Sequence, residues 1–189
     1  MSAPPAPPLL LASTSPQRRA ILEQLGLPFE VVEPRYEEQG DDPLEHAVGK
    51  ARSVTAADDR PVLGVDTVVV CDGRVLGKPA TAAEAEEMLE LLGGRTHEVV
   101  SGLCLRTPAW EEAGLETTLV EFRPLTARDL AWYVAGGEWE GRAGGYAIQG
   151  RGAALVRRIE GDFLNVVGLP AALLVRLLAE RFSGVYGFG

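Results

Sequence analysis

One carboxylate lies in the most apolar stretch of the chain. The segment VLGVDTVVVC places Asp66 between two apolar runs, and Asp72-Gly73 then has the composition of a two-residue hairpin turn before a return strand at 74–76. An ionised carboxylate in apolar surroundings is costly unless it is paired or bound to a metal. Asp66 is therefore a candidate for catalysis or metal binding. The alternative is a strand-end aspartate that caps a turn.

A loop rich in hydroxyl groups and arginines precedes the first expected helix. The segment LASTSPQRR puts Ser13 and Ser15 beside a helix N-terminus whose first turn carries Arg18 and Arg19. Backbone N–H groups and hydroxyls at such an end can hold a phosphate, and an arginine can bind it through two hydrogen bonds. Basic residues there oppose the helix dipole, which a bound anion would explain. The alternative is a capped helix with two solvated arginines.

An acidic loop and two lysines could extend such a site. Glu38, in the loop Tyr36-Glu37-Glu38, and Asp66 offer the hard oxygen ligands that suit Mg²⁺ or Mn²⁺. Lys50 follows in the next expected helix, and Lys78 is held in the stiff turn Gly77-Lys78-Pro79. Taken alone, each of these features also fits a solvated loop or a surface lysine.

A glycine-rich segment late in the chain has the character of a binding loop. In AGGYAIQG, residues 143–150, the glycines allow close approach of a ligand, Tyr146 offers a stacking face, and Gln149 offers an amide suited to a base edge. The alternative is a glycine-rich connection with a half-buried tyrosine.

The rare residue types limit the chemistry. The two histidines, His46 and His97, are too few for a histidine-rich metal centre, and His97, at a strand start, is predicted to be structural rather than catalytic. The two cysteines, Cys71 and Cys104, lie in apolar runs and are expected to be core residues rather than a disulfide or zinc ligands.

Charge and hydropathy exclude several classes of partner. The net charge of -9 disfavours nucleic acid polymers and anionic membranes, although a local basic pocket could still bind a small anion. No segment approaches the length of a membrane span, and the proline-rich start lacks the basic region of a signal peptide. We therefore expect a cytoplasmic protein without membrane or nucleic acid partners.

The order of the expected elements is typical of an α/β fold. A tail at 1–8, a single domain at 9–182 and a C-terminal end at 183–189 are predicted. Strands are expected at 9–12, 29–32, 62–71, 74–76, 96–106 and 116–122, a second hairpin from 153–159 and 163–167, and helices at 17–25, 43–57, 81–92, 127–135 and 170–182.

The motifs together resemble one family. The segments LASTSPQRR, GVDTVVV, GKP, GGRTHEV, AGGYAIQGRG and GDFLNVVGLP, with the acidic pair before GVDTVVV, occur in the order and at the spacing seen in the Maf family of nucleoside triphosphate pyrophosphatases, also called septum formation inhibitor proteins. The match runs from about Leu9 to Leu178. Each motif is weak alone, but their common order is highly specific.

This resemblance implies a fold, a reaction and a site. The fold would be a mixed twisted α/β sheet with flanking helices in two lobes around a cleft, like that of inosine triphosphate pyrophosphatases. The reaction would be metal-dependent hydrolysis of a nucleoside triphosphate to the monophosphate and pyrophosphate, linked to removal of modified nucleotides and to cell division arrest. The resemblance also allows a homodimer. Asp66 matches the proton acceptor, and the phosphate and metal site matches Ser13, Arg18, Glu38, Lys50 and Lys78, with Glu38 and Asp66 as metal ligands and Glu38 and Lys78 assisting catalysis.

Three residues fall where the family sets its base preference. Thr67 and Gln149 resemble the branch that prefers dTTP and UTP. Gln17 departs from the usual family pattern, because it replaces the first arginine of SPRR with a neutral amide of different charge and reach. A different or modified base therefore remains an alternative. A non-catalytic nucleotide-binding regulator of septum formation is the second alternative, although an acid such as Asp66 together with Lys78 favours an enzyme.

Overall fold

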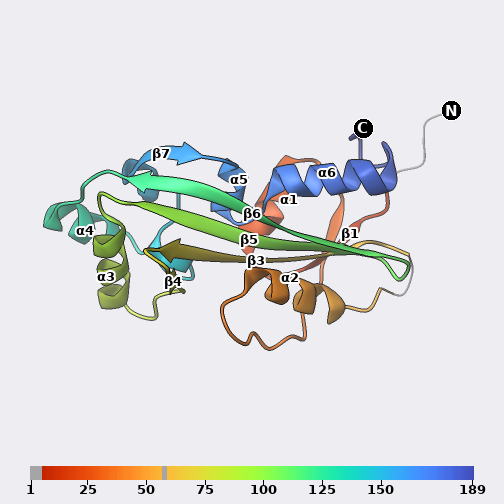
Figure 1. The fold of residues 1–189 in the computed structure, drawn as a ribbon, viewed down its shortest axis with the longest axis horizontal. Coiled ribbons are helices and arrows are strands. Elements are labelled where there is room, and N and C mark those ends of the chain that lie inside the picture. The colour runs from red at the N-terminus through yellow and green to blue at the C-terminus, as the bar shows by residue number, and fades with distance from the viewer. Residues whose placement is uncertain (1–5, 57–58) are drawn as a thin grey trace. The chain divides into compact units, whose positions relative to one another are not determined.

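The computed structural model describes residues 6–56 and 59–189, and within them seven strands form one mixed sheet (Figure 1). The strands are ordered β2-β1-β3-β5-β6-β7, with β4 paired to β3 off this path. Pairing is parallel between β1 and both β2 and β3, and antiparallel in the β3–β4 and β6–β7 pairs. The expected mixed α/β fold is confirmed.

The elements have the following bounds. The strands are β1 (Leu9–Ala12), β2 (Phe29–Val31), β3 (Val62–Cys71), β4 (Arg74–Leu76), β5 (Thr96–Arg106), β6 (Glu111–Phe122) and β7 (Val156–Glu160). The helices are α1 (Pro16–Gln24), α2 (Pro43–Arg52), α3 (Ala82–Leu92), α4 (Ala127–Val134), α5 (Phe163–Val167) and α6 (Ala171–Phe182), with short 3₁₀ turns η1 (Ala143–Gly145) and η2 (Arg151–Ala154).

The chain divides into two compact units, which correspond to the two lobes expected from the sequence. Among the described residues, unit 1 comprises those of Met1–Asp66, Ser101–Glu116 and Gly168–Gly189, and unit 2 comprises Thr67–Val100 and Thr117–Val167. Strand β3 passes from the first unit to the second between Asp66 and Thr67.

In unit 1 a glycine lets a helix lie directly against the sheet. Strand β1 is apolar and fully buried, as expected for a parallel strand covered on both faces. Helix α2 begins at Pro43 after Asp42, whose carboxylate accepts hydrogen bonds from the first turn. A Cβ on Gly64 of β3 would lie 2.1 Å from the carbonyl oxygen of Ala47, so only glycine permits this approach of α2 to β3 (Figure 1). The same approach brings the polar residues of α2 next to Asp66.

In unit 2 an aromatic core lies under two capped helices. Phe122, Tyr133 and Tyr146 are buried together with aliphatic residues of β3, β5 and α3. Each of these helices has a threonine at its N-cap. Thr126 forms a full capping box with Asp129, whereas Thr81 caps α3 without one, because the Glu84 carboxylate accepts from Ala80 instead.

Several sequence-based elements or bounds are wrong. The strand expected at 153–159 begins only at Val156, because residues up to Ala154 form the turn η2. Residues 163–167 form helix α5 rather than a strand, because Asp162 accepts the Leu164 N–H and so starts a helical turn. Strand β6 begins at Glu111 and not at 116, since the Thr107 N–H bonds to the Trp110 carbonyl and closes a tight turn. Helix α2 ends at Arg52, before the predicted 57. Position 57, like positions 1–5 of the expected tail, lies outside the described residues.

Candidate functional site

Lys50 joins two carboxylates in unit 1. Its Nζ lies 2.6 Å from Oδ1 of Asp66 and 2.5 Å from Oε1 of Glu38. Asp66 and Lys50 are each only 9% exposed, whereas the Glu38 side chain is half exposed. The alternatives of a turn-capping aspartate and a surface lysine therefore do not describe this structure. A buried cation shared by two acids is costly to assemble and therefore points to a function.

His46 completes the surroundings of Asp66, and the sequence reasoning did not select it as a site residue. Its Nδ1 lies 3.4 Å from Oδ2 of Asp66, and its Nε2 lies 3.1 Å from the main-chain oxygen of Gln39. Positions 46 and 50 are one helical turn apart on α2, so the two side chains share a face. This i, i+4 spacing of a histidine and a lysine was the signal available in the sequence.

Arg18 is buried at the start of α1 and held on two sides. Its Nη1 donates to Oγ of Ser13 at 3.0 Å, and its Nε donates to the Gly168 carbonyl at 2.9 Å. Burial lowers the pKa of Arg18 from its ordinary value, and the negative charges of Asp66 and Glu38 oppose this shift. The predicted phosphate-binding arginine is thus part of the same charged cluster. Its neighbour Arg19 is exposed, as a solvated residue would be.

Ser15 contacts Gln17 rather than capping α1. The Ser15 hydroxyl donates to Oε1 of Gln17 at 3.1 Å, and the helix has no side-chain cap. Gln17 is half-buried. The contact fixes the orientation of the amide and leaves its NH₂ as the group that Gln17 can direct to a ligand.

The remaining predicted site residues lie in unit 2. Thr67 follows Asp66 directly in β3 and is half-buried, while Lys78 and Gln149 are exposed. The Gly144 N–H bonds to the Gly77 carbonyl at 3.0 Å, so the turn that carries Lys78 is tied to the glycine-rich segment. The structure thus brings together Ser13, Arg18, Glu38, Lys50 and Asp66 in unit 1, whereas Lys78 and Gln149 are located within unit 2 alone.

The stacking role expected for Tyr146 is wrong. Its side chain is only 6% exposed, and its hydroxyl lies 2.8 Å from Nε2 of His97. Its ring packs edge-on against the rings of His97 and Phe122. Burial raises the pKa of Tyr146 and lowers that of His97 to about 4. Tyr146 therefore anchors the glycine-rich segment in the core, and His97 has the structural setting predicted for it.

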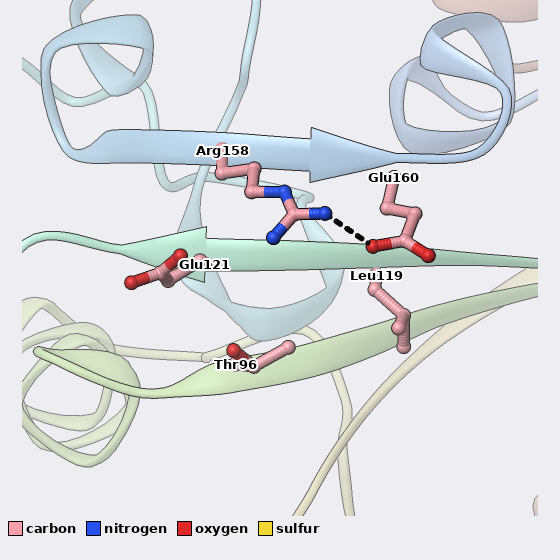
Figure 2. Close-up of a pocket in the computed structure, with 5 residues that line it drawn as sticks. All are labelled: Thr96, Leu119, Glu121, Arg158 and Glu160. Carbon is pink, nitrogen blue, oxygen red and sulfur yellow. Dashed lines mark hydrogen bonds and ion pairs between the residues drawn. The ribbon is translucent and has the colours of Figure 1, made fainter.

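A small pocket lies on the sheet of unit 2 and is lined by residues other than the predicted site residues. It has a volume of about 170 Å³ and is lined by Thr96, Leu119, Glu121, Arg158 and Glu160 (Figure 2). The Arg158 guanidinium already donates to Glu160 at 2.8 Å, as the dashed line shows. None of the predicted site residues lines this pocket.

Three side chains of unit 1 form a set of donors that could hold a metal ion. Glu38, His46 and Asp66 each offer one atom, and these atoms all lie within 4.8 Å of one another. The two carboxylates fit the predicted Mg²⁺ or Mn²⁺ ligands. In the part of the chain that is described, no helix has the length and apolar character needed to cross a membrane.

Comparison with known proteins identifies the class. The family model described as "Maf-like protein" matches residues 8–181. The chain therefore belongs to the Maf family, as the motif order predicted.

Named relatives cover nearly the whole chain. The dTTP/UTP pyrophosphatase of Deinococcus radiodurans is 46% identical, with 100% of both chains covered. The dTTP/UTP pyrophosphatase of Thermus thermophilus is 46% identical over 93% of this chain and 95% of its own. That of Pyrococcus furiosus is 42% identical over 90% and 93%, respectively.

Proposed function

We propose that this protein hydrolyses nucleoside triphosphates, dTTP and UTP above all, to the nucleoside monophosphate and pyrophosphate. The observation that carries the proposal is the buried cluster in which Lys50 joins Asp66 and Glu38 beside the buried Arg18. The names of the full-length relatives support the substrate class. We assign the activity to the predicted domain at 9–182.

Asp66 is the proposed general base. Its Oδ1 accepts a hydrogen bond from Lys50 at 2.6 Å, which holds the carboxylate in one orientation, with Oδ2 towards His46. A water placed against this carboxylate would transfer its proton to Asp66 as it attacks the α-phosphorus. A positioned base of this kind contributes roughly 10²–10⁴-fold to a rate.

Cationic groups of the chain would stabilise the leaving pyrophosphate. Charge accumulates on the leaving oxygens during phosphoryl transfer, so fixed positive groups lower the barrier. The Arg18 guanidinium is oriented by Ser13 and the Gly168 carbonyl before any substrate binds. Lys50 and the exposed Lys78 would add charge, and their flexible stems allow them to follow the phosphates.

A divalent ion fits the donor set of Glu38 and Asp66. Lys50 already lies between the same two carboxylates, so the ion and the ammonium would share them. When bound, Mg²⁺ or Mn²⁺ would neutralise phosphate charge and make a coordinated water more acidic. The half-exposed side chain of Glu38 would let this carboxylate adjust to the ion.

Base recognition is proposed for Gln17, Thr67 and Gln149. The Gln17 amide, held by Ser15, presents its NH₂ as a donor, and a donor suits the carbonyl oxygens of uracil or thymine. Gln149 is exposed at the end of the anchored glycine-rich segment and is therefore accessible to a ligand.

A substrate panel tests the proposal. Pyrophosphate release by the purified chain with Mg²⁺ or Mn²⁺ should be fastest with dTTP and UTP, compared with CTP, GTP and base-methylated analogues. A different order that Gln17→Arg shifts towards dTTP and UTP would assign the base preference to Gln17. Binding of dTTP without turnover of any member would overturn the enzyme proposal in favour of a nucleotide-binding regulator.

A further inference from the structure

The contacts of His46 define which ring nitrogen carries a hydrogen. Nε2 lies 3.1 Å from the Gln39 carbonyl oxygen, which can only accept a hydrogen bond. Nε2 therefore carries a hydrogen, and in the form of the ring that can bind a metal Nδ1 has the lone pair. The ring is 4% exposed, so water does not surround it. In that form the Nδ1 lone pair faces the Asp66 carboxylate inside the protein.

The distance between Nδ1 and Asp66 is unusual for a direct hydrogen bond. Nδ1 lies 3.4 Å from Oδ2. A charge-assisted hydrogen bond is typically about 2.7–2.9 Å long, so this contact is well beyond that range. When Nδ1 carries a lone pair, the two electron-rich atoms repel each other unless a positive centre lies near both. Two neighbouring ligands of an octahedral ion, each about 2.1 Å from it, stand roughly 3 Å apart. The separation is longer than an ordinary N–H···O hydrogen bond and lets the two atoms act as ligands of one ion.

The other donor atoms of the cluster also fit a bound ion. Lys50 is bonded to the other oxygen, Oδ1, at 2.6 Å. Glu38, His46 and Asp66 each place one donor atom within 4.8 Å of the others. The bond from Nε2–H to a main-chain carbonyl is the usual arrangement that fixes the tautomer of a metal-binding histidine.

We infer that His46 is a nitrogen ligand, through Nδ1, to the divalent ion held by Glu38 and Asp66. The inference rests on the proposed function, in which these carboxylates bind the ion. An imidazole ligand favours Co²⁺, Ni²⁺ or Zn²⁺, whereas a site made only of oxygen donors favours Mg²⁺. The chain should therefore discriminate between metals through His46 as well as through its acids.

The variant His46→Gln separates ligation from support of the loop. A glutamine amide can reach the Gln39 carbonyl as Nε2 does, but its side chain has the amide carbon, which is no ligand, where Nδ1 stands. Glu45→Gln is the matched control, since Glu45 is the exposed neighbour of His46 on α2 and loses a charge without losing a donor of the cluster.

Calorimetric titration of the full chain with Co²⁺ and, separately, with Mg²⁺ is the first test. We expect His46→Gln to weaken Co²⁺ binding by at least about 10-fold, because losing even a supporting partner of a ligand costs 10–100-fold. Mg²⁺ binding should change by less than about threefold, since oxygen donors dominate it. Glu45→Gln should keep the Co²⁺ to Mg²⁺ affinity ratio of the wild type. An unchanged ratio in a folded His46→Gln variant overturns the inference.

A second measurement needs no variant. In protein with isotopically labelled histidines, Zn²⁺ should shift the nitrogen resonance of His46 Nδ1 and leave buried His97 as an internal reference. No shift at saturating Zn²⁺ overturns the inference. Both tests measure metal binding, so failure of the proposed hydrolysis is seen separately, as absent pyrophosphate release with either metal.

Discussion

The two histidines of the chain are both buried, but their surroundings have opposite characters. His46 in unit 1 is 4% exposed and lies between a carboxylate and a carbonyl, next to a lysine that joins two acids. His97 in unit 2 is 1% exposed and lies among the rings of Phe122 and Tyr146. The histidine of unit 1 is buried among charged and polar groups, and the histidine of unit 2 is buried among aromatic rings.

This difference indicates where function resides. Burial of aromatic rings stabilises a fold directly through the hydrophobic effect and edge-to-face packing. Burial of charges such as Lys50 and Asp66 carries a large desolvation penalty, and apolar residues would often be as stable in their place. A cluster of this kind is therefore better explained by chemistry than by stability. We expect substitutions in the charged cluster of unit 1 to affect activity first and those in the aromatic core of unit 2 to affect stability first.

The largest effect is expected for Asp66→Asn. The amide keeps the shape of the side chain but cannot accept the proton of an attacking water, so turnover should fall by roughly 10²–10⁴-fold. Steady-state kinetics with dTTP measure the turnover. A thermal melt shows whether the variant folds. Near-full activity in the folded variant would contradict the role of Asp66.

Arg18→Lys should have the next largest effect. A lysine cannot contact both Ser13 and the Gly168 carbonyl in the way that the guanidinium does, so its charge would be displaced from the phosphates. A misplaced group of this kind costs about 10²-fold in kcat/KM. Arg19→Gln is the control, because Arg19 is exposed, and it should change kcat/KM by less than about twofold. Near-wild-type kcat/KM for Arg18→Lys, with a loss for Arg19→Gln, would show that overall charge matters and the position of the guanidinium does not.

In unit 2, His97 should make stability depend on pH. Burial lowers the pKa of His97 from 6.5 to about 4, so the unfolded chain binds the proton first as the pH falls. The stabilisation is complete above about pH 6.5 and is lost between there and pH 4, amounting to about 2 kcal/mol by pH 5. Urea unfolding at about pH 6.5 and at about pH 5 should show this loss of unfolding free energy. In the variant His97→Gln the difference between the two pH values should disappear. If the unfolding free energy of the variant depends on pH as strongly as that of the wild type, other groups cause the pH dependence.

Tyr146→Phe should have the smallest effect. The substitution removes the hydroxyl that bonds to His97 and leaves a buried nitrogen without its partner, at a cost of about 1–2 kcal/mol in unfolding free energy. The ring packing against Phe122 remains, so kcat with dTTP should stay within about twofold. Urea unfolding and steady-state kinetics together check both values. A large loss of activity without loss of stability would show that Tyr146 acts in the functional site and not only in the core.

Much of the fold followed from local patterns in the sequence. The Asp72-Gly73 turn between β3 and β4 is present, with both residues at positive φ, as a two-residue hairpin requires. Helix α5 was missed because a short apolar run does not distinguish a strand from a helix. The deciding contact is the bond from the Leu164 N–H to the Asp162 carboxylate.

Most members of the candidate site could be predicted from the sequence, but the contacts of individual residues could not. The order of motifs selected Ser13, Arg18, Glu38, Lys50 and Asp66, and the structure brings these five together, while their individual roles stay predictions. His46 was missed because its i, i+4 spacing from Lys50 gains meaning only when both side chains are seen to face Asp66. Its importance appears only when Gly64 lets α2 lie against β3. Tyr146 was misread because a glycine-rich segment gives no indication of the depth of its one aromatic residue.

The most direct test of the account is the fate of the oxygen of water. The purified chain would hydrolyse dTTP in water enriched in heavy oxygen, and the products would be separated and weighed by mass spectrometry. Attack at the α-phosphorus predicts heavy oxygen in the nucleoside monophosphate and none in the pyrophosphate. Heavy oxygen in the pyrophosphate, or release of orthophosphate in place of pyrophosphate, would contradict the proposed reaction and the role given to Asp66.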